Sequence, residues 1–273
     1  MIFVMNSPAE IARLYVDLGS QKAKLPSGKI FVLSVLAGMF IAMGGIGSTV
    51  ASFGIESAAL ARIVSALVFP IGLSLVLVGG AELFTGNNLM LMPVLQKRAK
   101  ISGMLRNWII VYLGNFVGSL IIAFLIAFSI ANPASSAPLY GGKLTQAFIQ
   151  TAWTKVNLGF GDAFIRGILC NFMVCLAVWI SMAASADLSG KIIALYLPVF
   201  LFVLCGFEHC VANMYFIPVG FIAMVQGGTP LAELPWFGFL VGNMIPVTLG
   251  NLVGGAGFTG ILYWYTYLQG NRE

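Results

Sequence analysis

Six long apolar runs follow one another along the chain and are separated by short polar stretches. Each run has about 20 residues or more, the length that an α-helix needs to cross the hydrocarbon core of a bilayer. The second and fifth runs are interrupted by glycine, asparagine and proline, a pattern that predicts helices broken inside the membrane. We therefore expect six membrane spans, at about residues 29–53, 59–95, 105–131, 162–186, 191–226 and 236–268.

The composition agrees with a membrane protein. Hydrophobic residues make up 59% of the 273 residues and charged residues only 8%, whereas soluble domains carry roughly 25% charged residues. A water-soluble core is therefore excluded, and the long runs favour helices over a barrel. The net charge of +5 does not indicate a nucleic-acid partner, because the placement of lysine and arginine matters more than their sum in such a protein. The predicted fold class is an all-α integral membrane protein in a lipid bilayer.

The basic residues predict the orientation of the spans. Ten of them, together with both termini, fall on one side, and four fall on the other: Arg62, Lys143, Lys155 and Arg166. Because cytoplasmic loops carry the excess of lysine and arginine, the side with ten is assigned to the cytoplasm. The segment at about 132–161 is then an external loop. We expect a multi-pass protein of the cell inner (plasma) membrane with cytoplasmic N- and C-termini.

Residues 1–28 precede the first span and predict a short helix. The segment Ser7-Pro8-Ala9-Glu10 has the residues of a capping box, with proline at the first helical position. We expect a cytoplasmic amphipathic helix that lies on the membrane surface or, as an equal alternative, an ordinary helix packed against the bundle. Residues 29–269 then form a single six-helix transmembrane domain.

The two halves of the chain share a repeated pattern. The skeleton G-x-E-x-x-x-x-N occurs at Gly80–Asn87 and at Gly206–Asn213, and L-G-N-x-V-G occurs at Leu113–Gly118 and at Leu249–Gly254. Each half contains three spans, an odd number, so the second half must insert upside down relative to the first. Inverted repeats with broken helices indicate a substrate path near the bilayer midplane.

Three ionisable side chains lie within this repeat, although such groups are costly at membrane depth. For Glu82 and Glu208 we favour a structural role, in which each braces a break by accepting hydrogen bonds from released backbone N–H groups or from Lys155. For His209, the only histidine, we favour a functional role, because its reference pKa of about 6.5 lets imidazole hold or release a proton near neutral pH. His209 has no counterpart in the first half, where Leu83 stands.

Four segments resemble the formate–nitrite transporter family of pentameric anion channels, and the resemblance covers nearly the whole chain. They are Ala81–Asn87, Cys170–Trp179, Gly206–Met214 and Ile245–Asn251. The resemblance implies an aquaporin-like fold with six transmembrane helices per protomer, arranged as two inverted three-helix repeats with broken second and fifth helices. It also implies a pore through each protomer of a homopentamer.

The resemblance further implies roles for single residues. His209 would be a proton donor in the substrate path, Thr85 its hydrogen-bond partner, Asn171 and Asn251 polar contacts beside the centre, and Lys155 an attraction for anions in the outer vestibule. Apolar constrictions would come from Phe69, Leu73, Leu83, Phe84 and Phe202. Bracing of the helix breaks would come from Glu82, Glu208, Asn87 and Asn213. No catalytic residue, metal site or cofactor is expected.

The expected function is passive or proton-coupled passage of small monovalent weak-acid anions, with formate first. Nitrite, hydrosulfide and short carboxylates are the alternative substrates. A neutral-solute pore of the aquaporin type is less favoured, because Asn87 and Asn213 are not followed by Pro-Ala. An intramembrane enzyme is disfavoured, because no nucleophile–base pair or metal triad can be assembled around a single histidine.

Overall fold

The computed structural model describes residues 5–129, 139–184 and 187–270, and every regular element among them is helical. The first half contains α1 (Pro8–Lys22), α2 (Ser27–Ser52), α3 (Ala58–Val68), α4 (Pro70–Val78), the 3₁₀ turn η1 (Gly86–Met90), α5 (Leu91–Leu95) and α6 (Ile101–Ser129). The second half contains η2 (Leu139–Gly142), α7 (Lys143–Val156), α8 (Phe160–Ser181), α9 (Leu188–Leu204), α10 (Cys210–Gln226), η3 (Leu231–Glu233), η4 (Gly238–Met244), α11 (Ile245–Leu252), η5 (Val253–Ile261) and α12 (Leu262–Leu268).

These helices confirm the six predicted spans. Among the described residues, five helical stretches are long and apolar enough to cross a membrane: α2, α3 with α4, α6, α8, and the run over 231–268. The fifth span is composite, because α9 and α10 are shorter apolar helices separated by a break. The last run changes from π-helical to α-helical geometry and back at η4, α11 and η5, a feature that the hydrophobic pattern did not predict.

Local sequence signals explain several helix ends. The Ser7 hydroxyl and the Glu10 carboxylate form the predicted capping box at the start of α1. Asp187 caps α9 by accepting the N–H groups of Ser189 and Gly190. Pro70 occupies the first position of α4, directly after α3, where its missing N–H leaves no hydrogen bond unmade.

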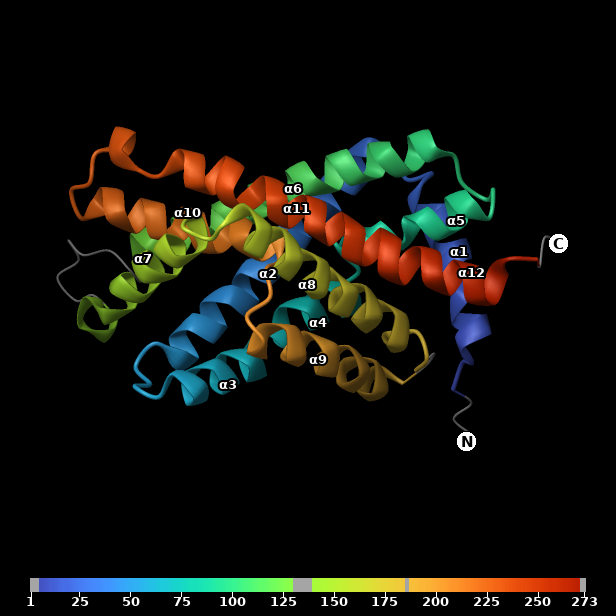
Figure 1. Cartoon of the computed structure of the whole chain (residues 1–273), viewed down its shortest axis with the longest axis horizontal. Coiled ribbons are helices and arrows are strands. Elements are labelled where there is room, and N and C mark those ends of the chain that lie inside the picture. The colour runs from blue at the N-terminus through green and yellow to red at the C-terminus, as the bar shows by residue number, and fades with distance from the viewer. Residues whose placement is uncertain (1–4, 130–138, 185–186, 271–273) are drawn as a thin grey trace.

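The N-terminal helix packs against the bundle, as one of the two expectations has it; its place at the membrane surface stays a prediction. Ile11, Ala12, Tyr15 and Val16 are buried in a cluster that also contains Trp179 and Leu268. The predicted external loop at about 132–161 contains a helix, because α7 occupies about half of it and packs against α10; residues 130–138, at the start of the loop, lie outside the described residues. The helices α1 and α7 precede corresponding spans, and Figure 1 shows them at opposite ends of the molecule, with α12 at the α1 end.

Glycines let corresponding helices of each half pack at very short range. A Cβ added to Gly118 of α6 would lie 2.0 Å from the Val35 carbonyl oxygen of α2. A Cβ added to Gly254 would lie 2.0 Å from the Ile168 carbonyl oxygen of α8. No side chain fits at either position, so small glycine faces join α2 to α6 and α8 to the last span. The fold is an inverted repeat built on these two close pairs.

Candidate functional site: two helix breaks joined by His209

The first helix break follows α4. Gly80 has a φ of +74°, a left-handed conformation that glycine adopts without steric cost, and it turns the chain out of the helix. The Glu82 N–H then donates to the carbonyl of Leu33 in α2 at 3.2 Å. A break at membrane depth must satisfy its backbone groups within the protein, and α2 supplies one of the partners.

A buried side chain of α6 supplies the others. The Asn115 amide donates to the carbonyls of Ser34 at 2.8 Å and Glu82 at 2.9 Å, and its oxygen accepts the Phe84 N–H at 2.9 Å. One asparagine therefore ties the break to α2 and to α6 at once.

The second break repeats this arrangement after α9. Gly206 has a φ of +69°, and the Glu208 N–H donates to the Arg166 carbonyl of α8 at 3.3 Å. Asn251 of α11 donates to the carbonyls of Gly167 at 2.7 Å and Glu208 at 3.0 Å, and accepts the Cys210 N–H at 2.9 Å. Asn251 is therefore the structural counterpart of Asn115. Its side-chain hydrogen bonds go to the backbone of the break and of α8, whereas the family resemblance implied a polar contact beside the pathway.

The Glu82 carboxylate is held in a buried polar network. The Lys22 ammonium, at the end of α1, donates to Glu82 Oε1 and to Asn87 Oδ1, both at 2.9 Å. Asn87 Nδ2 donates to Glu82 Oε2 at 2.7 Å and to Asn107 Oδ1 at 2.9 Å. Because the carboxylate has a cation and an amide as partners, its charge is compensated.

The Glu208 carboxylate has matching partners. The Lys155 ammonium, near the end of α7, donates to both carboxylate oxygens at 2.9 and 3.0 Å. Asn213 Nδ2 donates to Glu208 Oε2 and to Asn243 Oδ1, both at 2.7 Å. The expected contact of Lys155 is thus made with Glu208, whereas Glu82 has Lys22. Two details differ between the halves: Lys155 does not reach the Asn213 oxygen, which has no partner among the described residues, and it lies 5.5 Å above the Phe216 ring.

The histidine joins the two breaks. His209 caps α10, because its Nδ1 accepts the Ala212 N–H at 3.0 Å. In the neutral ring the proton is therefore on Nε2, which lies 2.9 Å from the Thr85 hydroxyl oxygen of the first break. Nε2 then donates to Thr85, and the hydroxyl hydrogen of Thr85 is left to point elsewhere. A proton added to Nδ1 would remove the acceptor and break the cap of α10.

A cavity of about 450 Å³ reaches His209 from the α7 end of the molecule. Its walls come from the end of α2, the start of α3, one face of α7 and both ends of the second break. Two phenylalanine rings line it beside His209. Phe69 and Phe202 meet edge to face with ring centroids 5.8 Å apart, and the Phe202 ring stacks on His209 at 6.0 Å. Both phenylalanines are only 3–4% exposed, so the cavity is narrow and apolar where it meets the histidine.

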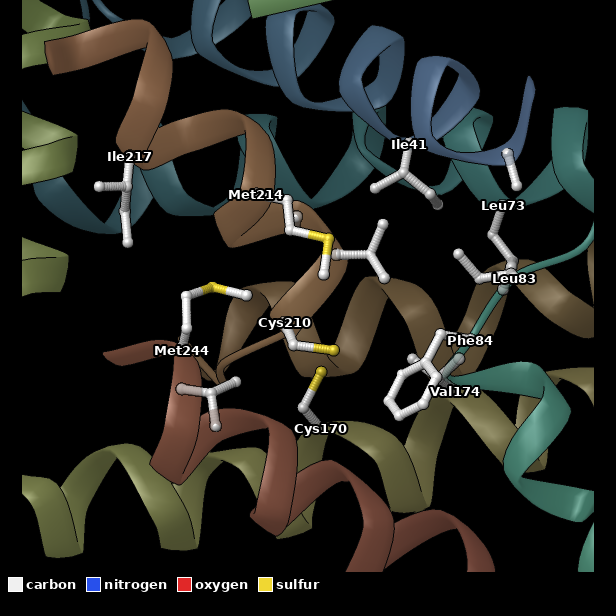
Figure 2. Packing of buried hydrophobic residues seen from close by; sticks show 14 of the residues in the cluster. Ile41, Leu73, Leu83, Phe84, Cys170, Val174, Cys210, Met214, Ile217 and Met244 are labelled. Carbon is white, nitrogen blue, oxygen red and sulfur yellow. The ribbon is translucent and has the colours of Figure 1, made fainter. Parts of the chain in front are cut away.

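The region beyond the histidine, around the first break, is apolar. Leu73, Leu83 and Phe84 are each less than 5% exposed and belong to one cluster with Val174, which Figure 2 shows. The Phe84 ring also packs edge to face on Tyr112, with centroids 5.0 Å apart. The structure thus places the residues predicted as constrictions in two groups, one at the cavity floor and one at the first break. That they line a pore remains a prediction.

Asn171 of α8 lies between the breaks. Its amide donates to the Thr85 carbonyl at 3.3 Å, to Asn88 Oδ1 at 2.7 Å and to the Asn251 carbonyl at 2.7 Å. It therefore fixes the backbone that bears Thr85. Among the described residues, no group of three or more His, Cys, Asp or Glu side chains could hold a metal ion.

Four polar residues of the site were not predicted from the sequence: Lys22, Asn107, Asn115 and Asn243. The signal for three of them was present. The repeat itself pairs Asn115 with Asn251, and eight residues before each of these asparagines stand Asn107 and Asn243. The repeated skeletons do not pair Lys22 with Lys155, because these lysines lie in α1 and α7, the helices that precede the first span of each half.

The fold and the joined breaks define a class: a helical membrane protein of inverted repeats with a polar centre in an apolar interior. Residues 9–265 match the protein family described as "Formate/nitrite transporter", and the chain belongs to this family. It is 43% identical to a "Probable formate transporter" of Methanothermobacter thermautotrophicus (97% of this chain, 98% of the other). It is 35% identical to "Formate channel FocA" of Escherichia coli strain K12 (98% and 97%).

Two solved structures are similar to the chain. One is described as "Pentameric formate channel with formate bound", with a TM-score of 0.75 and 35% identity over 89% of this chain and 98% of that one. The other is an "FNT family ion channel", with a TM-score of 0.80 and 27% identity over 94% and 98%. The recognised family and the fold class are both confirmed.

Proposed function

We propose that the chain conducts formate, and less readily other small monovalent weak-acid anions, across a membrane through a pore in each protomer. The observation that supports this most directly is the His209–Thr85 hydrogen bond, which puts the only imidazole of the chain at the junction of the two breaks. Relatives named formate transporter and formate channel and the similar structure with formate bound favour formate over nitrite or hydrosulfide.

The proposed path runs from the cavity, past Phe69 and Phe202, to His209 and Thr85, and on between Leu73, Leu83 and Phe84. A bare anion loses its hydration at a dry apolar constriction at a cost of several kcal/mol or more, whereas a neutral small acid loses far less. The apolar groups on either side of the histidine therefore favour a species that is neutral when it crosses.

His209 and Thr85 act together at the centre of this path. The ring donates from Nε2 to the Thr85 oxygen, so the threonine hydroxyl presents its own hydrogen toward the path. An anion at this point receives a hydrogen bond, or a proton from water held by the same pair. The chemistry is transport and needs no catalytic residue. Passive flux and anion–proton symport differ only in where that proton is released.

The remaining residues support the path. Asn171 and Asn251 hold the backbone beside the centre, and Glu82, Glu208, Asn87 and Asn213 brace the breaks. We place the α7 end outside the cell and both termini in the cytoplasm of a plasma-membrane protein, because the excess of basic residues lies at the α1 end. Residues 29–269 form the channel unit with α1 docked on it, and the similar pentameric structure supports a homopentamer.

Flux into liposomes that contain the purified protein tests this function. Uptake of formate, nitrite, hydrosulfide and glycerol is compared over a range of pH, with empty liposomes as the control. We expect formate to enter fastest and at a rate that depends on pH. Passage of glycerol without passage of any anion would refute the proposal in favour of a neutral-solute pore.

A further inference from the structure

The charges around the cavity do not act equally. Arg62, Lys155, Arg166 and Glu208 all line it. Lys155 binds both oxygens of Glu208 at 2.9 and 3.0 Å, so that lysine and glutamate together add no net charge. No ion pair involves either arginine within residues 5–129, 139–184 and 187–270. The excess positive charge of the cavity therefore resides on the arginines and not on Lys155, to which the sequence had assigned the attraction of anions.

Both arginines are positioned at the second break, but by different helices. Arg62 extends from α3, and its guanidinium lies against the turn: a Cβ added to Gly206 would lie 3.8 Å from Nη2 and 3.9 Å from Cζ and Nη1. Arg166 belongs to α8, and its carbonyl accepts the Glu208 N–H at 3.3 Å. Both residues are exposed. The Arg62 guanidinium thus lies at the break that bears His209, and both exposed arginines line the same cavity.

We propose that Arg62 and Arg166 form a capture site for planar oxyanions at the mouth of the cavity. The inference rests on the proposed function and adds the step before permeation. A guanidinium presents parallel N–H groups that match the two oxygens of a carboxylate or of nitrite, a match that an ammonium lacks. Hydrosulfide has a single acceptor atom, so it is attracted by the charge of the guanidinium but cannot accept the two parallel hydrogen bonds. The site therefore selects by shape as well as by sign.

The size of the cavity sets the state in which the anion is captured. A water molecule occupies roughly 30 Å³, so a cavity of about 450 Å³ holds formate together with many waters. The anion is thus bound while hydrated, and it loses its water only at Phe69 and Phe202. Capture raises the local concentration of the anion without changing the barrier at the constriction.

Concentration-dependent uptake into liposomes separates these steps. We expect Arg62→Gln and Arg166→Gln each to raise the formate concentration at half-maximal rate by about two- to fivefold at low ionic strength, the size expected for one exposed charge interaction. The maximal rate stays unchanged, and the difference shrinks near 1 M salt, where the Debye length is about 3 Å. The matched control is Lys143→Gln, which removes one charge at the α7 end from a residue that does not line the cavity.

Lysine substitutions test the shape of the captured anion. Arg62→Lys and Arg166→Lys keep the charge, so the half-maximal concentration for hydrosulfide stays at the wild-type value, whereas that for formate rises. Glutamine variants that match Lys143→Gln, or that lower only the maximal rate, would overturn the capture site. A wild-type protein that passes no formate would refute the proposed function instead, so the two failures are distinguishable.

Discussion

The two helix breaks have the same scaffold and different centres. Each begins at a glycine with positive φ, is tied down by one asparagine, and holds one glutamate between a lysine and a second asparagine. The residue after the glutamate differs: Leu83 in the first break and His209 in the second. The shared residues maintain an interruption that a membrane helix does not otherwise tolerate, and the one unshared position supplies the polar chemistry.

The largest effects are expected from the clamping asparagines. Asn115→Ala and Asn251→Ala each leave two backbone groups of a break without this partner, the glutamate carbonyl and one N–H group, at about 1–3 kcal/mol per group. Both variants should lose most of their folded protein, and by similar amounts, in thermal unfolding followed in detergent. Asn157→Ala is the control, because that amide makes its hydrogen bond on the exposed surface. If one clamp tolerated alanine and the other did not, the two breaks would not be equivalent.

The ion pairs come next. Lys22→Met and Lys155→Met each leave a buried carboxylate without its cation, and breaking such a pair costs about 3 kcal/mol. The lysines are 16% and 15% exposed, so we expect equal losses in the melting temperature. Adding Glu82→Gln to the first variant and Glu208→Gln to the second should restore most of each loss. A rescue in only one half would show that the pairs serve different purposes.

Substitutions of His209 test the difference between the breaks. His209→Asn retains a capping group for the Ala212 N–H but removes the donor to Thr85, so the melting temperature should change little while formate flux falls about tenfold, equivalent to about 1.4 kcal/mol. His209→Leu copies the first break and loses both the cap and the donor. Flux by the asparagine variant that equalled wild type at every pH would make His209 a structural cap alone.

A smaller effect is expected at Tyr15. Its hydroxyl donates to the Gly86 carbonyl at 3.0 Å in the buried contact between α1 and the first break. At the matching place in α7 stands Phe148, which is also buried and has no hydroxyl. Tyr15→Phe should therefore lower stability by about 1 kcal/mol, the net contribution of one hydrogen bond. Tyr265→Phe, at an exposed residue of α12, is the control. An equal loss of stability in both variants would show that the hydrogen bond from Tyr15 to Gly86 does not stabilise the protein.

The smallest effect concerns pH. Hydrogen bonds from the Ser7 side chain and backbone hold the pKa of Glu10 below its ordinary value, whereas α7 begins at Gly142 without a side-chain cap. A lowered pKa means that the cap stabilises α1 above the ordinary glutamate pKa and is lost as pH falls through the folded-state value. The protection factors for hydrogen exchange in the first turn of α1, which correct for the pH dependence of intrinsic exchange, should fall on acidification, and those of α7 should not. Glu10→Gln should abolish the dependence.

The sequence predicted the spans and the breaks because both leave local signals. Runs of apolar residues define spans, and the pair Gly-x-Glu marks each break. The partners of the glutamates were harder to predict, since Lys22 lies 60 residues from Glu82 and 53 residues separate Lys155 from Glu208. Hydrophobic pattern contains no information on which distant cation meets a buried carboxylate. Lys155 was expected as a donor to the glutamates, but not as the partner of Glu208 alone, and Lys22 was not expected as the partner of Glu82.

The glycine contacts have a mechanical consequence. Where α6 touches α2, and where the last span touches α8, backbone rests on backbone with no side chain between them. The two helices of each pair move as one rigid body, because no layer of side chains lies between them that could rearrange. Any widening at the centre must then come from the break segments, each tethered by an asparagine and a lysine. The two break segments are therefore both the places where the structure can deform and the places where its buried polar groups lie.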